Sequence, residues 1–460
     1  MQQFCTFPSF DRERSAVLRI PAWNRRRHFM IRIAPVGRAL AVVAATSLAL
    51  TACGGGGGDT ATQASQSAAP ASSAPAAKGD GTLTLGTLLP QTGSLAFLGP
   101  PEFAGVDLAL KEINEAGGVL GKPVQKYDTD SGDTTTNIAS QSVDKLLAQK
   151  ADAIIGAASS SVSESVIDKI TGAGVVHFSP ANTSDKFTTM EDKGLYFRTA
   201  PPDKLQGRVL GDLIISDGND TVGIMAMQDS YGTGLADQVQ KTVTDGGAEV
   251  VERVDYDPKA ADFSADVAKI KAKNPKGIVL IGFEETAKVI QELVKQGMPA
   301  SKYKWYMVDG NMSNTNYVKM PKGTLKGVKG TYPGAAAPDE FRDKLKGVNP
   351  KLEDYTYAPE SYDAANLIAL AAEAAKSDAG VDIAAKLAEV SKGGTKCKSF
   401  KECVDLLKAG TDIDYDGVSG PVEFNEAGDP AVATIGIYQY ADDNKYPVKA
   451  LEYRSGNISG

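Results

Sequence analysis

The chain has 460 residues, with 49 Lys or Arg against 57 Asp or Glu, and its formal net charge is −8. Residues 1–52 contain eight Arg and two acidic residues, so that 41 basic and 55 acidic residues remain without them and the net charge becomes −14. A surface this acidic repels phosphate backbones, which excludes nucleic acid as an expected partner.

The first predicted element is an export signal. Residues 39–50 form an apolar run that follows Arg32 and Arg38 and precedes small residues. A run of about a dozen residues fits a secretory signal better than a membrane span. We therefore expect the protein to act outside the cytoplasm.

The apolar run ends in Leu-Thr-Ala-Cys at residues 50–53, which resembles the lipobox of bacterial lipoproteins. The resemblance implies cleavage before Cys53, a diacylglycerol on its thiol, and attachment to the cell membrane on the extracytoplasmic face, periplasmic or cell-surface. The alternative is an ordinary signal followed by a free Cys. The glycine run at residues 54–58 favours the lipoprotein interpretation.

The start of the chain allows two interpretations. Met30 begins a signal of ordinary length, so we interpret residues 1–29 as an upstream extension from a wrongly assigned start and residues 30–52 as the signal peptide. The pair Arg26-Arg27 before His28 also resembles a twin-arginine export signal, and in that alternative the true start lies upstream.

Residues 53–81 are predicted to be a lipid anchor and a disordered linker. After Cys53 the composition is dominated by Gly, Ala, Ser, Pro, Thr and Gln, which cannot bury enough apolar surface to fold. A coil of about 28 residues spans roughly 30 Å on average. The linker would hold the folded part near the membrane.

The remaining residues, 82–460, exceed the roughly 250–300 residues at which single cores stop growing, so two domains are expected. The expected strands are 82–89, 152–155, 175–178, 221–227, 248–254, 277–282 and 304–308. The expected helices are 100–116, 161–171, 234–247, 263–273 and 285–297. This alternation predicts an α/β fold with parallel sheets covered on both faces.

In such sheets ligands bind beyond the carboxyl ends of the strands. The predicted strand ends are followed by residues 89–99, 156–161, 179–184, 228–231, 282–285 and 309–312. These segments contain Ser, Thr, Tyr, Phe and Asp, but none has the glycine pattern of a dinucleotide or phosphate-binding loop. No cofactor is expected.

Cysteine and histidine usage argues against catalysis. With Cys5 upstream and Cys53 lipidated, Cys397 and Cys403 remain as a pair in an oxidising compartment, where a short disulfide is expected. His177 lies in an apolar run and is expected to be a core residue. One His and no free Cys cannot form most zinc sites or a nucleophilic triad, and the carboxylates match no catalytic pattern. We predict neither a metal site nor an enzyme.

Several segments resemble one known family. They are GTLLPQTGSLAFLGPPEFAGVDLALKEINEAGGVLGKPV, IIGAASSSVSESV, VVHFSPANTS, DSYGTGLA and VDGN. The chain is similar, over essentially residues 82–440, to the leucine/isoleucine/valine-binding proteins, the type I periplasmic substrate-binding lipoproteins of ABC importers.

The resemblance implies the type I periplasmic-binding-protein fold, α/β with two Rossmann-like lobes whose parallel sheets are joined by a hinge of three crossovers. Lobe 1 is expected at residues 82–200 and 333–418. Lobe 2 is expected at residues 201–332 and 419–460. The crossovers themselves are placed near 199–203, 329–335 and 417–425.

The resemblance also implies a binding site for the carboxylate of an amino acid. By motif position its ligands are the hydroxyls of Ser160 and Thr183, with Ala158 and Ser159 lining the site by backbone. A helix N-terminus independently favours an anion, because it offers unpaired N–H groups and the positive end of the helix dipole. The alternative is that the serines 159–161 only cap the helix.

For the ammonium group, the resemblance implies the carboxylate of Asp309 and the carbonyl of Ala181. A buried ammonium requires a charge-assisted acceptor. The alternative for Asp309 is a turn-forming role in VDGN.

The resemblance places Leu98, Tyr231 and Phe283 around the ligand's side chain. Tyr231 matches the family, whereas Leu98 and Phe283 stand where some members carry Tyr, and Asn182 replaces a small apolar residue. Glu284 and Glu285 beside Phe283 are expected at an exposed helix start, with contact to a polar ligand group as the alternative.

Residues 412–423 match the letters of an EF-hand calcium loop, with Asp412, Asp414, Asp416, Gly417 and Glu423 at the pattern positions. In the register of the family, this segment is the third crossover and not a loop between two helices. We interpret the match as a chance one in an acidic turn, with a weak calcium site as the alternative. A helix is expected at 400–408, beside the cysteine pair.

The resemblance implies a protein that closes around a branched-chain or other apolar amino acid and delivers it to an ABC permease and its ATPase. We expect a monomer. One alternative keeps the pocket and changes the ligand to a short amide, urea or an aromatic acid. Another is a sensor that passes closure to a signalling partner.

Overall fold

The computed structural model describes residues 79–458. The predicted signal, Cys5 and the predicted lipidation site Cys53 lie outside the described residues. Within 79–458, no helix combines the length and the apolarity that a bilayer span requires.

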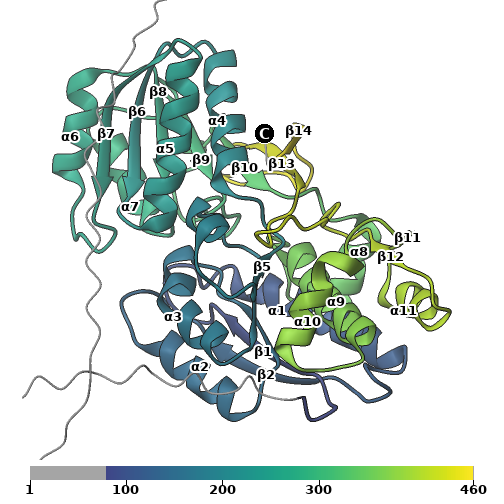
Figure 1. Ribbon diagram of the computed structural model, residues 1–460. Helices are drawn as coiled ribbons and strands as arrows, with labels where there is room; N and C mark the ends of the chain where they lie inside the picture. Colours follow the sequence, from purple (N-terminus) through teal and green to yellow (C-terminus); the bar gives the residue numbers. More distant parts are fainter. Residues whose placement is uncertain (1–78, 459–460) are drawn as a thin grey trace, which may run out of the picture. The chain divides into compact units, whose positions relative to one another are not determined.

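Lobe 1 contains a parallel five-stranded sheet (Figure 1). In spatial order its strands are β2 (Gln125–Asp130), β1 (Thr84–Leu89), β3 (Ala153–Gly156), β4 (Val176–Ser179) and β5 (Tyr196–Arg198). Every residue of β1, β3 and β4 is buried, as expected for parallel strands covered on both faces. The edge strand β2 is partly exposed throughout.

Helices cover both faces of this sheet. They are α1 (Gly99–Glu115), α2 (Ile138–Ala148), α3 (Ser160–Gly172), the 3₁₀ helix η1 (Asp185–Thr189), α8 (Asp339–Val348), α9 (Ala358–Ala375), α10 (Gly380–Val390) and α11 (Phe400–Lys408). Leu88 and Ile154 pack with α2 and α3, whereas their neighbours Leu89 and Ile155 pack with α1 and α9. The alternation of side chains along each strand therefore supplies two separate cores.

Lobe 2 contains a mixed seven-stranded sheet. In spatial order its strands are β14 (Glu452–Asn457), β13 (Val432–Gln439), β10 (Lys329–Pro333), β9 (Lys304–Val308), β8 (Gly277–Ile281), β6 (Thr221–Met227) and β7 (Glu249–Tyr256). The expected parallel arrangement holds for β6 to β10. β13 and β14 are not among the expected strands, and they pair antiparallel: β13 lies beside β10 after the third connection, and β14 turns back along β13.

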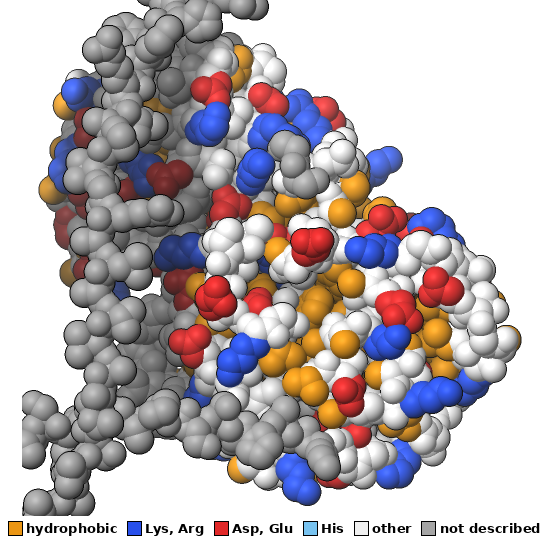
Figure 2. All heavy atoms as spheres, in the orientation of Figure 1, with side chains coloured by type: hydrophobic (Ala, Val, Ile, Leu, Met, Phe, Trp, Pro, Cys, Tyr) orange, Lys and Arg blue, Asp and Glu red, His pale blue; other side chains and the backbone are white. Residues whose placement is uncertain are grey.

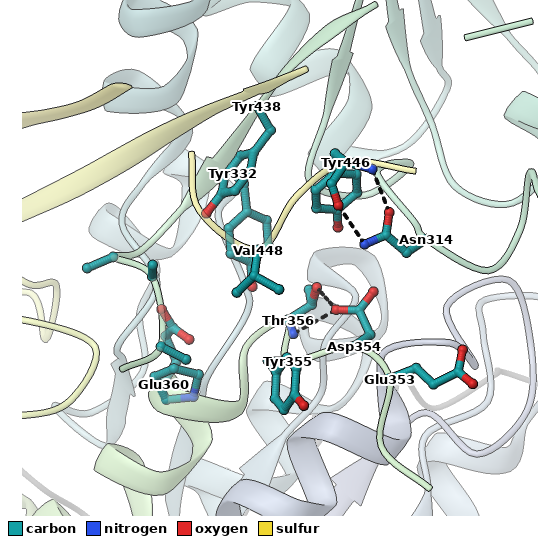
Figure 3. Close-up of a pocket in the computed structure, with 14 residues that line it drawn as sticks. Asn314, Tyr332, Glu353, Asp354, Tyr355, Thr356, Glu360, Tyr438, Tyr446 and Val448 are labelled. Carbon is teal, nitrogen blue, oxygen red and sulfur yellow. Dashed lines mark hydrogen bonds between the residues drawn. The ribbon is translucent and has the colours of Figure 1, made fainter. Parts of the chain in front are cut away.

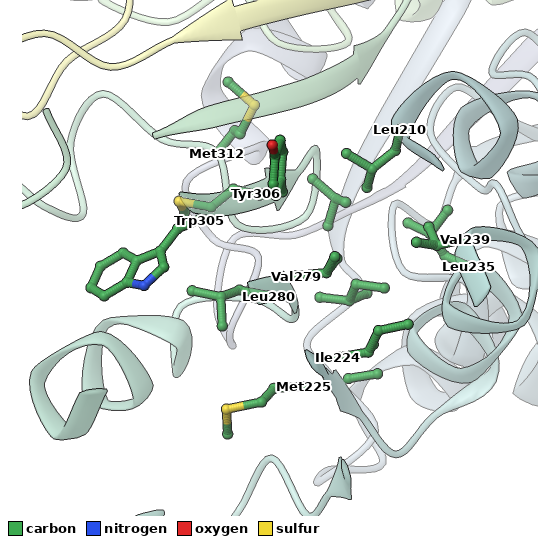
Figure 4. Close-up of a cluster of buried hydrophobic side chains, with 14 of the residues drawn as sticks. Leu210, Ile224, Met225, Leu235, Val239, Val279, Leu280, Trp305, Tyr306 and Met312 are labelled. Carbon is green, nitrogen blue, oxygen red and sulfur yellow. The ribbon is translucent and has the colours of Figure 1, made fainter. Parts of the chain in front are cut away.

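The core of lobe 2 is formed by this sheet and four helices. The helices are α4 (Asp203–Ser216), α5 (Ser230–Asp245), α6 (Ser264–Lys273) and α7 (Thr286–Lys295). Figure 4 shows Leu210, Leu235 and Val239 of α4 and α5 against Ile224 and Val279 of the sheet. Burial of each such side chain stabilises the folded state by about 1.5–3 kcal/mol relative to an exposed side chain. Apolar packing therefore holds the ends of the strands in place.

The predicted elements of the α/β alternation are present, with bounds within two residues except at the start of α5. That helix begins at Ser230, four residues earlier than predicted. The Asp229 carboxylate caps it by accepting the N–H of Gly232 at 2.7 Å.

Three connections join the two sheets, at residues 199–202, 334–338 and 416–431. A fully buried ion pair links the end of β5, directly before the first connection, to the third connection, with Arg198 Nε donating to Asp429 Oδ1 at 2.6 Å. The guanidinium also donates to the carbonyls of Asn182 and Ser184. These bonds satisfy the buried charges, which would otherwise be strongly destabilising.

Acidic and basic side chains are interspersed on the face shown in Figure 2. Among the described residues, oppositely charged side chains form local surface pairs, for example Lys386–Glu389 at 2.6 Å and Lys401–Asp405 at 2.7 Å. Exposed pairs of this kind contribute at most about 1 kcal/mol each. On this face the acidic excess is therefore not gathered into one binding patch.

A disulfide joins Cys397 to Cys403, which confirms the predicted pair. It links the short strand β11 (Thr395–Cys397) to α11, and β11 pairs with β12 (Ile413–Tyr415). The calcium-like motif, residues 412–423, begins one residue before β12 and includes it.

The glycine of the calcium-like motif lies against a buried carboxylate. Asp363 of α9 accepts hydrogen bonds from Tyr415 Oη, from the N–H groups of Val418 and Ser419, and from Ser419 Oγ at 2.6–3.0 Å. A Cβ on Gly417 would lie 2.4 Å from Asp363 Oδ2. Gly417 therefore permits the close approach of the loop to Asp363.

The acidic residues of the motif have other partners. Asp414 lies 3.4 Å from Lys396 Nζ, and Asp416 lies 3.7 Å from Lys398 Nζ. In the part of the chain that the structure describes, no group of three or more His, Cys, Asp or Glu side chains is arranged to hold a metal ion.

We predict that Gly417→Ala destabilises the protein by about 1–3 kcal/mol, as overpacking of a buried site does. The matched control is Gly347→Ala in α8, where an added Cβ has no atom within 4 Å and the helix tolerates Ala well. Chemical denaturation of both variants measures the difference.

Calcium at millimolar concentration is expected to leave the unfolding midpoint of the wild type unchanged, because the loop is held by Asp363. A rise in the midpoint with calcium, together with a Gly417→Ala variant as stable as the wild type, would contradict this account.

Candidate functional site

The carboxyl ends of strands from both sheets meet at one small cavity of about 20 Å³. Its lining residues are Leu95, Leu98, Ala158, Ser159, Ser160, Ala181, Thr183, Tyr231, Phe283, Asp309, Gly310 and Tyr357. All nine residues predicted to contact the ligand are among them. The topology thus brings together strand ends that lie up to about 210 residues apart in the sequence.

One end of the cavity is formed by the N-terminus of α3. Ser159 is the N-cap, and its Oγ accepts the N–H of Val162 at 3.4 Å, so the expected capping role is present. Ser160 is the first helical residue, and its Oγ accepts the N–H of Ser184 at 3.3 Å. Its hydroxyl proton is left for another acceptor. Together with the helix dipole, this end favours an anion.

The backbone before α3 is held by the next strand. The carbonyl of Ala157 accepts from Ser179 Oγ at 2.8 Å and from Asn182 Nδ2 at 2.9 Å. The Asn182 amide also donates to the carbonyl of Ala158 at 2.8 Å. These bonds fix the position of the helix end relative to Ala181 and Thr183.

Asn182 therefore has a different role from the one expected. Its Oδ1 accepts from Tyr196 Oη at 3.0 Å, so the whole amide is used inside lobe 1 and does not line the cavity. Glu285 is likewise not at an exposed helix start. It is 8 % exposed, and its Oε1 accepts from Tyr256 Oη and the N–H of Phe283.

Asp309 lies after β9 and contributes a buried carboxylate to the cavity, only 4 % exposed. It accepts from Gln206 Nε2 at 2.8 Å, from Tyr231 Oη at 2.9 Å and from Tyr357 Oη at 2.7 Å. All three donors are neutral. Burial raises the pKa of Asp309, and the bonds from Tyr357, Gln206 and Tyr231 oppose that shift.

Gln206 and Tyr357 were not predicted from the sequence. Gln206 lies inside α4, and Tyr357 stands in a left-handed conformation directly before α9, with φ 57°. Neither follows a strand of the predicted sheets, and neither belongs to a recognisable motif. The contact of Gln206 with Asp309 depends on the packing of α4 inside lobe 2, and the contact of Tyr357 with Asp309 depends on the packing of the two lobes.

Apolar and aromatic side chains form the remaining walls. The rings of Tyr231 and Phe283 are stacked, with centroids 5.5 Å apart and planes inclined by 14°. Leu95 and Leu98 belong to the segment between β1 and α1. This wall suits an apolar group that lies between the two polar ends.

Hydrogen bonds between the lobes close the cavity. Ser161 Oγ donates to Asp229 Oδ2 at 2.9 Å and lies 3.0 Å from Ser230 Oγ. A cavity of about 20 Å³ holds roughly one water molecule. A ligand larger than water must therefore enter with the lobes further apart.

A larger pocket of about 460 Å³ adjoins the cavity and shares Leu95, Ser159 and Phe283 with it. It also contains Asp229, one partner of the contact between the lobes. This pocket is large enough for a small organic ligand.

His177 is fully buried, as the sequence predicted, and lies edge-on to Tyr196 with ring centroids 5.3 Å apart. Burial lowers the pKa of His177 to about 4, so the imidazole is neutral at physiological pH. It is a core residue of β4 and does not line the cavity.

Comparison with known proteins gives relatives over the whole described fold. A Pseudomonas aeruginosa protein named leucine-, isoleucine-, valine-, threonine-, and alanine-binding protein is 26% identical over 366 residues, which cover 79% of this chain and 91% of that protein.

Two solved structures match in fold with a TM-score of 0.67 each. The branched-chain amino acid transporter substrate binding protein LivJ from Streptococcus pneumoniae, in complex with isoleucine, is 22% identical, with 82% of this chain and 99% of that chain covered. A solute binding protein of an ABC transporter from R. palustris, in complex with 4-hydroxybenzoate, is 18% identical, with 81% and 97% covered.

Periplasmic binding proteins of this family are extracytoplasmic, bind small molecules for ABC permeases and are not enzymes. The sequence model of the family described as periplasmic binding protein matches residues 82–445. This chain belongs to the periplasmic binding protein family.

Proposed function

We propose that this protein is the substrate-binding component of an ABC importer and captures an α-amino acid with an apolar side chain, such as a branched-chain amino acid. The amino-acid ligands named for the Pseudomonas aeruginosa and Streptococcus pneumoniae proteins are consistent with this ligand class. The 4-hydroxybenzoate bound by the R. palustris protein makes an aromatic acid the second candidate.

The proposal rests on one observation: the same cavity has one end that favours an anion and another that favours a cation. The α3 N-terminus with Ser160 favours an anion, and Asp309 is a buried carboxylate whose three hydrogen-bond donors are all neutral. An uncompensated buried charge costs several kcal/mol, and an ammonium group would relieve that cost. A zwitterion satisfies both ends, whereas an aromatic acid satisfies only the first.

Hinge closure accounts for binding and release. Lobe 1 would capture the carboxylate at Ser160 and Thr183, and lobe 2 would then bring Asp309 to the ammonium group and Tyr231 to the ligand's side chain. The ligand stabilises the closed form because only that form has both sets of contacts. The contact of Ser161 with Asp229 and Ser230 would add to the closed form.

We further propose that Cys53 carries a lipid and anchors the protein to the extracytoplasmic face of the membrane. The lipobox-like sequence at residues 50–53 supports this proposal. The first described residues are bound to lobe 1, because Asp378 Oδ2 accepts the N–H groups of Asp80, Gly81 and Thr82 at 2.7–3.0 Å.

Asp309→Asn is predicted to weaken isoleucine binding at least tenfold, which corresponds to about 1.4 kcal/mol. The amide keeps the size and most hydrogen bonds of the carboxylate but removes the charge that pairs with ammonium. Calorimetric titration of protein freed of carried ligand by unfolding and refolding measures the loss.

The control for this variant is a ligand without an ammonium group. The affinity for 4-hydroxybenzoate should not fall in Asp309→Asn. Isoleucine affinity equal to that of the wild type would refute the ammonium site, and tight 4-hydroxybenzoate binding with no isoleucine binding would replace the proposed ligand by an aromatic acid.

Acidification is predicted to weaken isoleucine binding before an ordinary Asp would titrate. Burial raises the pKa of Asp309, so its carboxylate takes up a proton and loses its charge at a higher pH than usual. Titrations across a pH series should therefore have a steeper loss in the wild type than in Asp309→Asn. Parallel pH profiles would count against a role for this charge.

Ser160→Ala combined with Thr183→Val is predicted to weaken isoleucine binding roughly hundredfold, because each hydrogen bond to a charged group contributes about 1.5–3 kcal/mol. Ser165→Ala is the matched control on the same helix, since Ser165 Oγ donates to the carbonyl of Val162 and does not line the cavity. Equal affinities for the double variant and the control would show that the anion site is elsewhere.

Cys53→Ser is predicted to move the protein from the membrane fraction to the soluble fraction and to abolish incorporation of a radiolabelled fatty acid. Cys5→Ser is the control and should change neither result. Continued lipid labelling of Cys53→Ser would be incompatible with the proposed anchor.

A further inference from the structure

A second cavity, of about 60 Å³, lies beside the second connection between the lobes. Its walls come from β10, from the connection 334–338, from the segment before α9, from the first turn of α9 and from β13 with the segment that follows it. None of its lining residues lines the cavity at Asp309. It is therefore a separate site.

The charged groups of this cavity are all acidic. Glu353, Asp354 and Glu360 line it, and no Lys, Arg or His among residues 79–458 does. Glu360 is only 2 % exposed, and its Oε2 has no hydrogen-bond partner among those residues. Asp354 Oδ2 also has no hydrogen-bond partner among the described residues, whereas Asp354 Oδ1 accepts a hydrogen bond from Thr356. Two carboxylate oxygens are thus buried without a donor.

Aromatic rings form the opposite part of the wall. Tyr438 lies edge-on to Tyr332, with centroids 6.2 Å apart, and to Tyr446 at 5.4 Å. Figure 3 shows these three rings in the upper part of the cavity, with Glu360 at the lower left and Asp354 at the lower right. Ring faces attract cations, most strongly where water is excluded.

We propose that this cavity binds a small organic ammonium ion, whose charge the Glu360 carboxylate pairs and whose carbon groups pack on Tyr332, Tyr438 and Tyr446. A volume of about 60 Å³ accommodates roughly four water-sized groups, which suits a methylated or short alkyl ammonium. A calcium ion fits this cavity less well, because calcium takes six to eight oxygen ligands. The described residues contain no cluster of three or more ligating side chains.

The groups that face Glu360 support a proton-linked site. They are Glu102 from α1, Tyr332 from β10, Tyr438 from β13 and Asp363 from α9 itself, all of them acids. Burial, with a contribution from Asp363, raises the pKa of Glu360 to about 8. The carboxyl is charged above that pH and neutral below it, so affinity for a cation should rise as the pH increases from 7 to 9.

Tyr357 separates the two cavities. Its N–H donates to Tyr332 Oη at 2.5 Å, and its hydroxyl donates to Asp309 at 2.7 Å. A test must therefore distinguish cation binding at Glu360 from binding at Asp309. The Asp309→Asn variant removes the charge at Asp309, so a cation that binds to this variant does not pair with that group. The outcome is therefore independent of whether the protein binds amino acids as proposed.

The experiment is a calorimetric titration of the full chain carrying Asp309→Asn with trimethylammonium chloride at pH 8.5, against sodium chloride and the neutral isostere tert-butyl alcohol. Saturable binding of trimethylammonium alone is expected. Adding Glu360→Gln should weaken it at least tenfold. This variant removes an unpartnered buried charge, so it should melt at the same temperature or higher.

Glu353→Gln is the matched control, because Glu353 lines the same cavity but is exposed. It should change the affinity less than twofold. Absence of saturable binding, equal binding by tert-butyl alcohol, or equal losses in Glu353→Gln and Glu360→Gln would each overturn the proposal. Affinity that does not rise between pH 7 and pH 9 would also do so.

Discussion

One small cavity contains both a helix N-terminus that favours an anion and a carboxylate that favours a cation. The two groups meet because the two sheets direct the C-terminal ends of their strands toward the same cavity. The α3 N-terminus belongs to lobe 1, and Asp309 follows β9 of lobe 2. Neither group is compensated by a charge of its own lobe within hydrogen-bond distance in the described residues. The proposed specificity for a zwitterion therefore depends on the packing of the two lobes. Each lobe alone would bind only one charged group of the ligand.

The buried carboxylates of this chain differ in how fully the protein satisfies them. Asp429 is paired with Arg198, and Asp363 accepts one hydrogen bond from Tyr415 of β12 and three from the loop that follows, so both serve the fold. Asp309 accepts only neutral donors and lines a cavity. Glu360 retains an oxygen with no donor among the described residues and lines another cavity. An ionised carboxylate that is buried without a charged partner is costly, so each cavity should bind a cation best at a pH above the pKa of the carboxyl group that lines it.

The fold was predictable where buried strands alternate with amphipathic helices, since those patterns depend on local burial. The pattern does not distinguish β13 and β14 as antiparallel, because pairing direction depends on where the chain returns to the sheet. α9 is buried along most of its length and lacks a polar face to mark it as a helix. The site residues that follow strands were named in advance, whereas Gln206 and Tyr357 reach Asp309 only through tertiary packing. Asn182 follows a strand too, yet its amide is turned into lobe 1 by Tyr196 and two carbonyls.

The central claim is that the cavity at Asp309 binds both the carboxylate and the ammonium group of an amino acid. Calorimetry of the ligand-free full chain with isoleucine, with 3-methylpentanoic acid, which lacks the ammonium group, and with 2-methylbutylamine, which lacks the carboxylate, tests it most directly. We predict roughly micromolar affinity for isoleucine, about −8 kcal/mol, and losses of at least about a hundredfold for each analogue. Binding of the acid as tight as that of isoleucine would contradict the claim, because Asp309 would then contribute nothing to recognition.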